Sequence, residues 1–107
     1  MVIFWVLFMF VALERLINLH DGYRKTFRVN GQALLLLVVD NRPVLLEDRC
    51  PHQGAPLAAA TLEGDVLRCP RHGLSFSLAS GRALQPGCAA LNLISLAYEG
   101  DRIGIDL

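Results

Sequence analysis

Two short stretches of this chain follow nearly the same pattern, and together they limit its fold and chemistry more than any other feature. CPHQGAPL begins at Cys50 and CPRHGLSF begins at Cys69, so each contains a cysteine, a proline, a histidine and a glycine in that order. The proline after each cysteine fixes its own φ angle, and the glycine lets the backbone turn tightly. The chain is therefore expected to contain two pre-shaped loops, each presenting two soft metal ligands.

The four candidate metal ligands are Cys50, His52, Cys69 and His72. A lone cysteine is usually a small buried hydrophobe, but four such residues in two matched loops indicate a metal site. Zinc would accept two thiolates and two imidazoles, although zinc fingers usually take two cysteines from one loop and two histidines from another. One cysteine and one histidine per loop suits a two-iron centre, in which one iron takes both cysteines and the other takes both histidines.

Length and composition place these loops in one small folded domain. The 107 residues are 53% hydrophobic and 19% charged, which argues against disorder. Ten basic and ten acidic residues cancel, and no basic cluster interleaves with aromatic residues, so the sequence gives nucleic-acid binding no support. The three cysteines are an odd number and two lie in the loops, so reduced metal ligands in a cytoplasmic protein fit better than a disulfide framework.

Turn residues interrupt the chain about every eight to twelve residues, and the segments between them have strand character. Many short strands at this spacing predict an all-β sandwich or barrel. Only Pro56–Glu63 has the character of a helical turn, and Gly100-Asp101 is expected to close a hairpin. The expected strands are Lys25–Val29, Ala33–Asp40, Pro43–Asp48, Asp65–Cys69, Leu93–Glu99 and Arg102–Leu107.

The first thirteen residues, MVIFWVLFMFVAL, form an uninterrupted apolar run. A membrane-spanning helix needs roughly 20 such residues, and Glu14 and Arg15 end the run too early. A signal peptide needs a positively charged n-region and a small-residue cleavage site, and the sequence shows neither feature. We expect a buried or edge strand preceded by a hydrophobic extension over residues 1–9, with an interfacial anchor or an oligomer contact as the alternatives.

The loop spacing, Cys-x-His, sixteen residues, then Cys-x-x-His, resembles the signature of the Rieske [2Fe–2S] family. The segment Leu78–Leu84 and the following Gln85–Gly87 resemble the hairpin and proline loop that cover the cluster in that family. The resemblance implies a Rieske domain over residues 10–107, with stacked antiparallel sheets and the two loops at one tip. It also implies one [2Fe–2S] cluster, with both cysteines on the inner iron and both histidines on the outer iron.

The sequence departs from one branch of this family, the Rieske proteins of quinol-oxidising respiratory complexes. That branch carries a disulfide between its loops, and the matching positions here are Ala55 and Arg71. It also carries a serine and a tyrosine that hydrogen-bond the cluster sulfurs, where this chain has Leu74 and Phe76. The chain instead resembles soluble bacterial Rieske-type ferredoxins, or a small Rieske subunit of a reductase.

The resemblance implies an electron carrier and not an enzyme in its own right. The expected donor is a reductase, in particular a flavoprotein, and the expected acceptor is a terminal oxygenase or reductase. Rieske oxygenases need a further iron held by two histidines and a carboxylate, and only His20 is left for such a site. A nitrite-reductase-type small subunit and a zinc-bound structural module are the alternatives. Cys88 is interpreted as a small buried hydrophobe, with a redox-active thiol as its alternative role.

Overall fold

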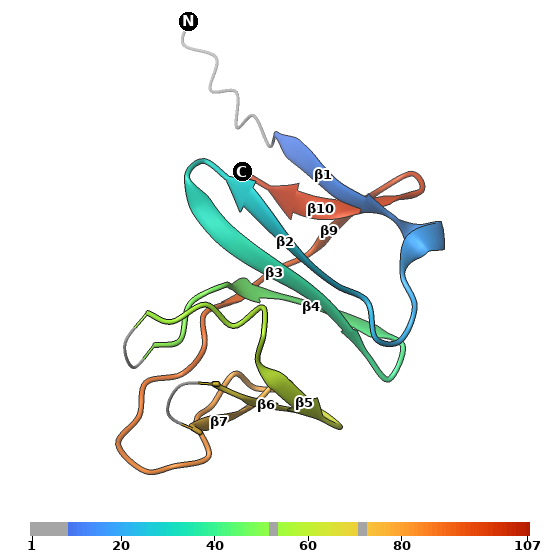
Figure 1. Ribbon diagram of the computed structural model, residues 1–107. Coiled ribbons are helices and arrows are strands. Elements are labelled where there is room, and N and C mark those ends of the chain that lie inside the picture. The colour runs from blue at the N-terminus through green and yellow to red at the C-terminus, as the bar shows by residue number, and fades with distance from the viewer. Residues whose placement is uncertain (1–8, 52–53, 71–72) are drawn as a thin grey trace, which may run out of the picture. The chain divides into compact units, whose positions relative to one another are not determined.

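The computed structural model describes residues 9–51, 54–70 and 73–107, and these residues form an all-β structure (Figure 1). The chain divides into two compact units. The smaller unit combines the chain ends, up to Asn18 and from Ser95, and the larger covers Leu19–Ile94. Within the described residues, the strands form three sheets, and every strand pair is antiparallel. The predicted all-β class is therefore confirmed.

The larger unit is built around a four-stranded sheet in the order β2-β3-β4-β8. Strand β3 (Gln32–Val39) lies inside this sheet, and each residue of its apolar run Leu34–Val39 is at most 6% exposed. An apolar run without polar alternation is typical of a strand that is covered on both faces. The sequence prediction for this strand is confirmed. The other strands of the sheet are β2 (Arg24–Val29), β4 (Arg42–Glu47) and β8 (Leu93–Ile94).

A second sheet in the larger unit consists of three short strands, β5 (Thr61–Glu63), β6 (Val66–Arg68) and β7 (Ser75–Ser77), in that order. Pro56–Glu63, whose composition predicted a helical turn, contains a single turn at residues 57–60, and its last residues form β5, which was not predicted. The chain makes a turn in which the Ala60 N–H donates to the Leu57 carbonyl at 2.9 Å, and then it extends. Directly after this turn, pairing with β6 holds the chain in the extended conformation of β5.

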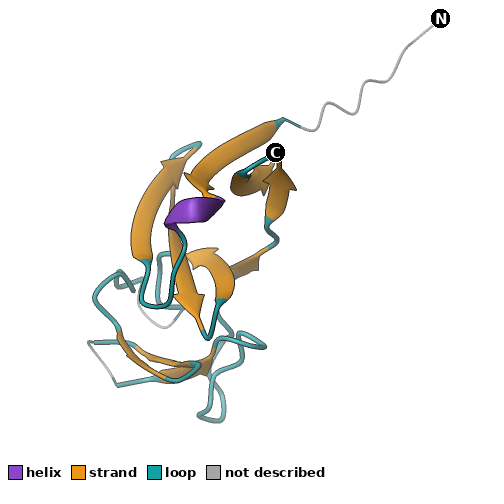
Figure 2. Cartoon of the chain, turned by 90° about the vertical axis from the view of Figure 1, so that its right-hand side faces the viewer, coloured by secondary structure: helices purple, strands orange, loops and turns teal. Residues whose placement is uncertain are grey.

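One hydrophobic core joins the two sheets of the larger unit. Leu35 of β3, Leu67 of β6 and Phe76 of β7 belong to a single cluster of buried side chains. The same cluster contains both Cys50 and Cys69. Among the described residues, the chain between β4 and β8 consists mostly of loops, which are teal in Figure 2, and contains the short strands β5, β6 and β7. The loops that carry the two cysteines are therefore anchored by this core.

The smaller unit has its own sheet in the order β1-β10-β9. Strand β1 (Phe10–Arg15) is at an edge of this sheet, as the sequence predicted for the end of the apolar run; residues 1–8 of that run lie outside the described residues. Strands β9 (Ala97–Glu99) and β10 (Arg102–Asp106) form the predicted hairpin. Gly104 of β10 lies so close to the Val11 carbonyl that a Cβ atom would collide with it.

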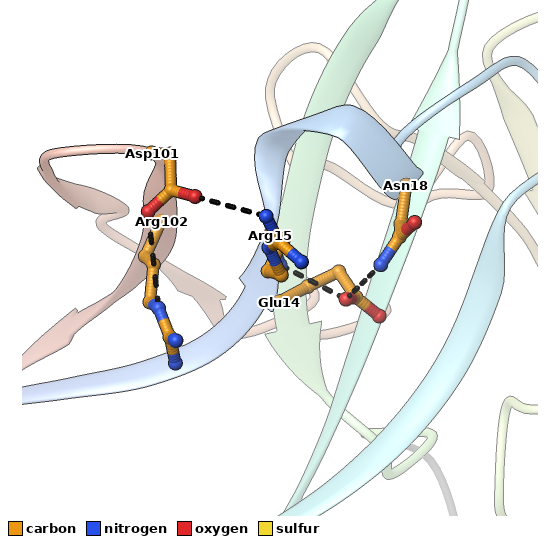
Figure 3. Close-up of polar contacts among 5 residues, drawn as sticks. All are labelled: Glu14, Arg15, Asn18, Asp101 and Arg102. Carbon is orange, nitrogen blue, oxygen red and sulfur yellow. Dashed lines mark hydrogen bonds and ion pairs between the residues drawn. The ribbon is translucent and has the colours of Figure 1, made fainter.

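Polar contacts lie where β1 ends, next to the turn between β9 and β10. Arg15 Nη2 lies 3.4 Å from Asp101 Oδ2, and Asn18 Nδ2 donates to Glu14 Oε1 at 2.9 Å; dashed lines mark both contacts in Figure 3. The short 3₁₀-helix η1 (Leu16–Asn18) follows β1 here. In residues 9–51, 54–70 and 73–107, no helix has the length and apolar character needed to cross a membrane.

The segment Leu93–Glu99 does not form the single strand that its composition predicted. Its first part, β8, pairs with β4, whereas its last part, β9, pairs with β10 in a different sheet. Ser95 and Leu96 carry the chain from one sheet to the other. An apolar composition marks a segment that can extend, but it does not mark where a strand changes its partner.

Candidate metal centre

The first predicted loop follows strand β4 and is closed by hydrogen bonds to both sides of Cys50. The Cys50 N–H donates to the Ala55 carbonyl at 2.7 Å, and the Gly54 N–H donates to the Cys50 carbonyl at 2.7 Å. Gly54 has φ of 73°, a conformation that glycine adopts readily and other residues do not. Just before the loop, the Asp48 carboxylate accepts a hydrogen bond from the Leu57 N–H at 2.6 Å. This carboxylate therefore fixes the chain beyond the loop.

The second predicted loop joins strands β6 and β7 and repeats the same hydrogen-bond pattern. The Cys69 N–H donates to the Leu74 carbonyl at 2.8 Å, and the Gly73 N–H donates to the Cys69 carbonyl at 3.0 Å. Gly73 again has a positive φ, of 65°. The two loops that the sequence predicted to be alike therefore do have one backbone design, in which the cysteine and the glycine four residues later close a tight turn.

A glutamine side chain supports the second loop from outside. Gln85 Oε1 accepts from the Ser75 N–H at 2.7 Å, and Gln85 Nε2 donates to the Ser75 carbonyl at 3.2 Å. The intervening segment Leu78–Leu84 folds back on β7, because the Ser77 N–H donates to the Arg82 carbonyl at 2.9 Å. The hairpin that the family resemblance implied is therefore present, and Gln85 at its end binds the first residue of β7.

Both predicted cysteine ligands are buried and free of disulfide bonds. Cys50 is 0% exposed and Cys69 is 1% exposed, and both belong to the same hydrophobic cluster. The other two predicted ligands, His52 and His72, lie outside the described residues. Within the described residues, no group of three or more His, Cys, Asp or Glu side chains is placed to hold a metal ion. The donors that can be placed are two thiols, which are soft ligands suited to iron or zinc.

The residues around the two cysteines are apolar where the quinol-oxidising branch has polar or cross-linked ones. Phe76 is fully buried, Ala55 is 6% exposed, and Leu74 packs against the core cluster. None of these side chains has a hydroxyl or a thiol, and Arg71 lies outside the described residues. The side chains at these three positions are therefore apolar and supply no hydrogen-bond donor.

Cys88 does not take the role that its sequence position suggested. It is a free thiol of intermediate burial, so the interpretation as a buried hydrophobe was wrong. Cys88 directly follows an exposed turn at Pro86-Gly87, and this turn does not pack into the core.

The sequence did not reveal the loop-supporting contacts of Asp48 and Gln85, nor the position of Arg49 beside the first loop. Asp48 and Gln85 act through contacts nine and ten residues away, which no local pattern reveals. The guanidinium of Arg49 lies against Gly54, and a repeat in the sequence could have drawn attention to this arginine. The tripeptide Arg-Cys-Pro occurs twice, beginning at Arg49 and at Arg68, so the repeat starts one residue before each cysteine.

The all-β fold and the two matched loops define a small β protein with two similar turns whose cysteines lie in its core. Residues 9–95 match the family model described as the Rieske [2Fe-2S] domain. The chain belongs to this family. Membership implies a Rieske [2Fe–2S] cluster as the cofactor, and the predicted family and cofactor are confirmed.

Curated relatives include carriers of about this size and much larger proteins. The ferredoxin component of the naphthalene 1,2-dioxygenase system of Pseudomonas aeruginosa is 32% identical over 80 residues, which are 74% of this chain and 77% of that protein. Apoptosis-inducing factor 3 of Mus musculus is 35% identical over 90 residues, which are 82% of this chain. The match spans only 15% of the length of the mouse protein.

Solved structures show the same fold. The ferredoxin of Sphingomonas yanoikuyae B1 superimposes with a TM-score of 0.80 and 25% identity, covering 92% of this chain and 99% of that one. The complex of reduced oxygenase and oxidised ferredoxin in carbazole 1,9a-dioxygenase contains a chain with a TM-score of 0.75 and 25% identity. That match covers 87% of this chain and 97% of the other. The predicted Rieske ferredoxin-like fold is therefore confirmed.

Proposed function

We propose that this protein carries one electron at a time, on a Rieske [2Fe–2S] cluster, from a reductase to a terminal oxygenase. The observation that carries the proposal is the pair of loops with one hydrogen-bond pattern, which place Cys50 and Cys69 in the same buried core. A lone buried cysteine would be an ordinary core residue, but two in matching turns are a ligand pair.

The proposed ligand set is Cys50 and Cys69 on the inner iron, and His52 and His72 on the outer iron. Each loop then contributes one ligand to each metal, which is a reason for the chain to contain nearly the same loop twice. When bound, the cluster supplies a one-electron redox step, and its reduced form carries about one negative charge more than its oxidised form.

The chain's own residues bind the cluster and isolate it. The two thiols bind as thiolates from inside the core, and Phe76 and Leu74 exclude water on the side of the second loop. Asp48 and Gln85 hold the segments that flank the loops, so that the ligands keep one geometry in both redox states.

The proposed partners are inferred from the systems to which the relatives belong. One relative is the ferredoxin component of a dioxygenase system, and one matching chain was solved in complex with an oxygenase. By analogy, we assign the acceptor to the class of Rieske terminal oxygenases and the donor to the class of flavoprotein reductases.

The proposed electron-carrying domain comprises residues 10–107 and is preceded by an apolar extension over residues 1–9. The proposed location is the cytoplasm.

Stopped-flow mixing tests this function. The dithionite-reduced protein is mixed anaerobically with the oxidised oxygenase component of naphthalene dioxygenase, and the visible band of its cluster is followed. Reoxidation that grows faster with oxygenase concentration is expected, and Cys88→Ser should behave like the natural protein. Cys69→Ala should carry no cluster and transfer nothing. A colourless protein that contains zinc in place of iron would contradict the proposal.

A further inference from the structure

An arginine precedes each of the two cysteines, but the two arginines lie in different surroundings. A Cβ atom at Gly54 would lie 3.1 Å from Nε of Arg49 and 3.5 Å from its Nη2. The guanidinium of Arg49 therefore lies against the backbone of the first loop. At Gly73, the equivalent position in the second loop, a Cβ would meet no described atom within 4 Å, so Arg68 makes no such contact.

The Arg49 side chain also faces an open pocket of about 480 Å³ beside the first loop. In the part of the chain that the structure describes, Arg15 and Arg102 form ion pairs with Asp101, and Arg49 takes part in no ion pair. The two carboxylates at the pocket, Glu47 and Asp48, accept hydrogen bonds from the Asn92 amide and from a backbone N–H. The lining includes Arg28, Asn30, Glu47, Asp48, Arg49 and Gly54.

We propose that Arg49 raises the reduction potential of the cluster by holding a positive charge against the first loop, and that Arg68 has a much smaller effect. This inference rests on the proposed role of Cys50 as a ligand. The reduced cluster carries the extra negative charge, so a nearby cation stabilises the reduced form more than the oxidised form. An arginine keeps its charge at every accessible pH, which makes its contribution constant.

Matched substitutions separate the two arginines. We expect Arg49→Gln to shift the one-electron equilibrium about threefold toward the oxidised form, which is about 30 mV. Arg68→Gln should shift the equilibrium by less than half as much. Arg49→Glu should roughly double the shift of Arg49→Gln, and Arg49→Lys should remove most of it, because lysine restores the charge. Glu47 and Asp48 are unchanged in all four variants, so their charges cancel in the comparison.

Ionic strength distinguishes a charge effect from a structural one. Arg49 is an exposed residue, so mobile ions can screen its charge. The Debye length falls from about 30 Å at 0.01 M salt to about 3 Å at 1 M. The potential difference between the natural protein and Arg49→Gln should therefore shrink strongly across this range, whereas a change in loop packing would leave it constant.

Protein-film voltammetry of the full chain supplies these values, with the visible spectrum as a control for the cluster. Equal shifts in Arg49→Gln and Arg68→Gln would overturn the inference, as would a shift that salt does not change. Loss of the cluster in Arg49→Gln would also overturn it, because Arg49 would then be a structural support. Absence of any cluster from the natural protein would instead contradict the proposed function itself.

Discussion

The two cysteine loops share one backbone design, yet different parts of the fold support them. The first loop leads from the four-stranded sheet to the three-stranded one, and Asp48 just ahead of Cys50 holds the chain beyond it. The second loop connects two neighbouring strands of one sheet, and Gln85 holds it from further along the chain. A repeated sequence motif thus specifies each turn, while residues that are not repeated fix each turn in its place.

The comparison predicts that the two loops are equally necessary for the cluster. Cys50→Ala and Cys69→Ala should each abolish the visible spectrum and lower the thermal stability by a similar, large amount, because cluster binding is coupled to folding. His72→Ala should do the same. Iron content and the thermal midpoint of each purified variant provide the measurement.

Cys88→Ser is the matched control for the cysteine variants, because Cys88 is a free thiol that lies outside both loops. It should keep the full iron content and the natural spectrum. If the cluster survives loss of either loop cysteine but not loss of Cys88, the ligand assignment is wrong.

The two external supports should contribute comparable stability to their loops. Asp48→Ala removes a charge-assisted hydrogen bond, worth about 1.5–3 kcal/mol. Gln85→Leu leaves the Ser75 N–H without its partner in a partly buried position, which costs about 1–3 kcal/mol. Denaturant titration followed by loss of the cluster absorbance should show both losses.

Asn92→Ala serves as the control for the two supports, because it removes an exposed hydrogen bond to Glu47 that lies outside the loops. It should change the stability by no more than about 0.5 kcal/mol. A variant of Asp48 or Gln85 that is as stable as Asn92→Ala would show that its loop is self-supporting.

Phe76 provides a test that concerns the second loop alone. This side chain is fully buried in the cluster of core residues that contains both cysteines. Phe76→Tyr should add a donor to a cluster sulfur and raise the reduction potential by on the order of 100 mV, because such a bond contributes about 1.5–3 kcal/mol. An unchanged potential would show that the correspondence with the quinol-oxidising branch fails at this position.

Substitutions of the two loop glycines, Gly54 and Gly73, should differ from each other least, because only their effects on the reduction potential are expected to differ. Gly54→Ala and Gly73→Ala each place a side chain at a positive φ, which costs roughly 1–2 kcal/mol. Only the first variant also pushes against Arg49, whose flexible side chain can move away. Both proteins should lose similar stability, but only Gly54→Ala should also lower the potential. Voltammetry of both variants checks this, and equal potentials would count against the contact with Arg49.

Sequence patterns predicted the parts of this molecule that are determined locally. The continuous apolar run of β3 predicted a buried strand, and the Cys-Pro and glycine positions predicted two tight turns. The parts that depend on distant partners were missed. Strand β5 forms because β6 lies beside it, although its segment begins with good helix formers.

The candidate site shows the same division. Its cysteines stand out in the sequence because they repeat, whereas Asp48 and Gln85 become visible only once the chain has folded. The wrong interpretation of Cys88 has a related cause, because burial depends on what covers a residue and not on its type.

Protein-film voltammetry of the natural protein tests most directly whether one mixed-ligand cluster is held by both loops. Histidine ligation places Rieske centres at roughly −150 to +300 mV, against about −400 mV for plant-type ferredoxins with four cysteine ligands. Because Leu74 and Phe76 supply no donor, we predict a one-electron wave near the low end, at roughly −200 to −50 mV. A wave near −400 mV would contradict the histidine ligands, and a protein without any wave would contradict the cluster. A potential above about +150 mV would contradict the ferredoxin assignment and favour the quinol-oxidising branch.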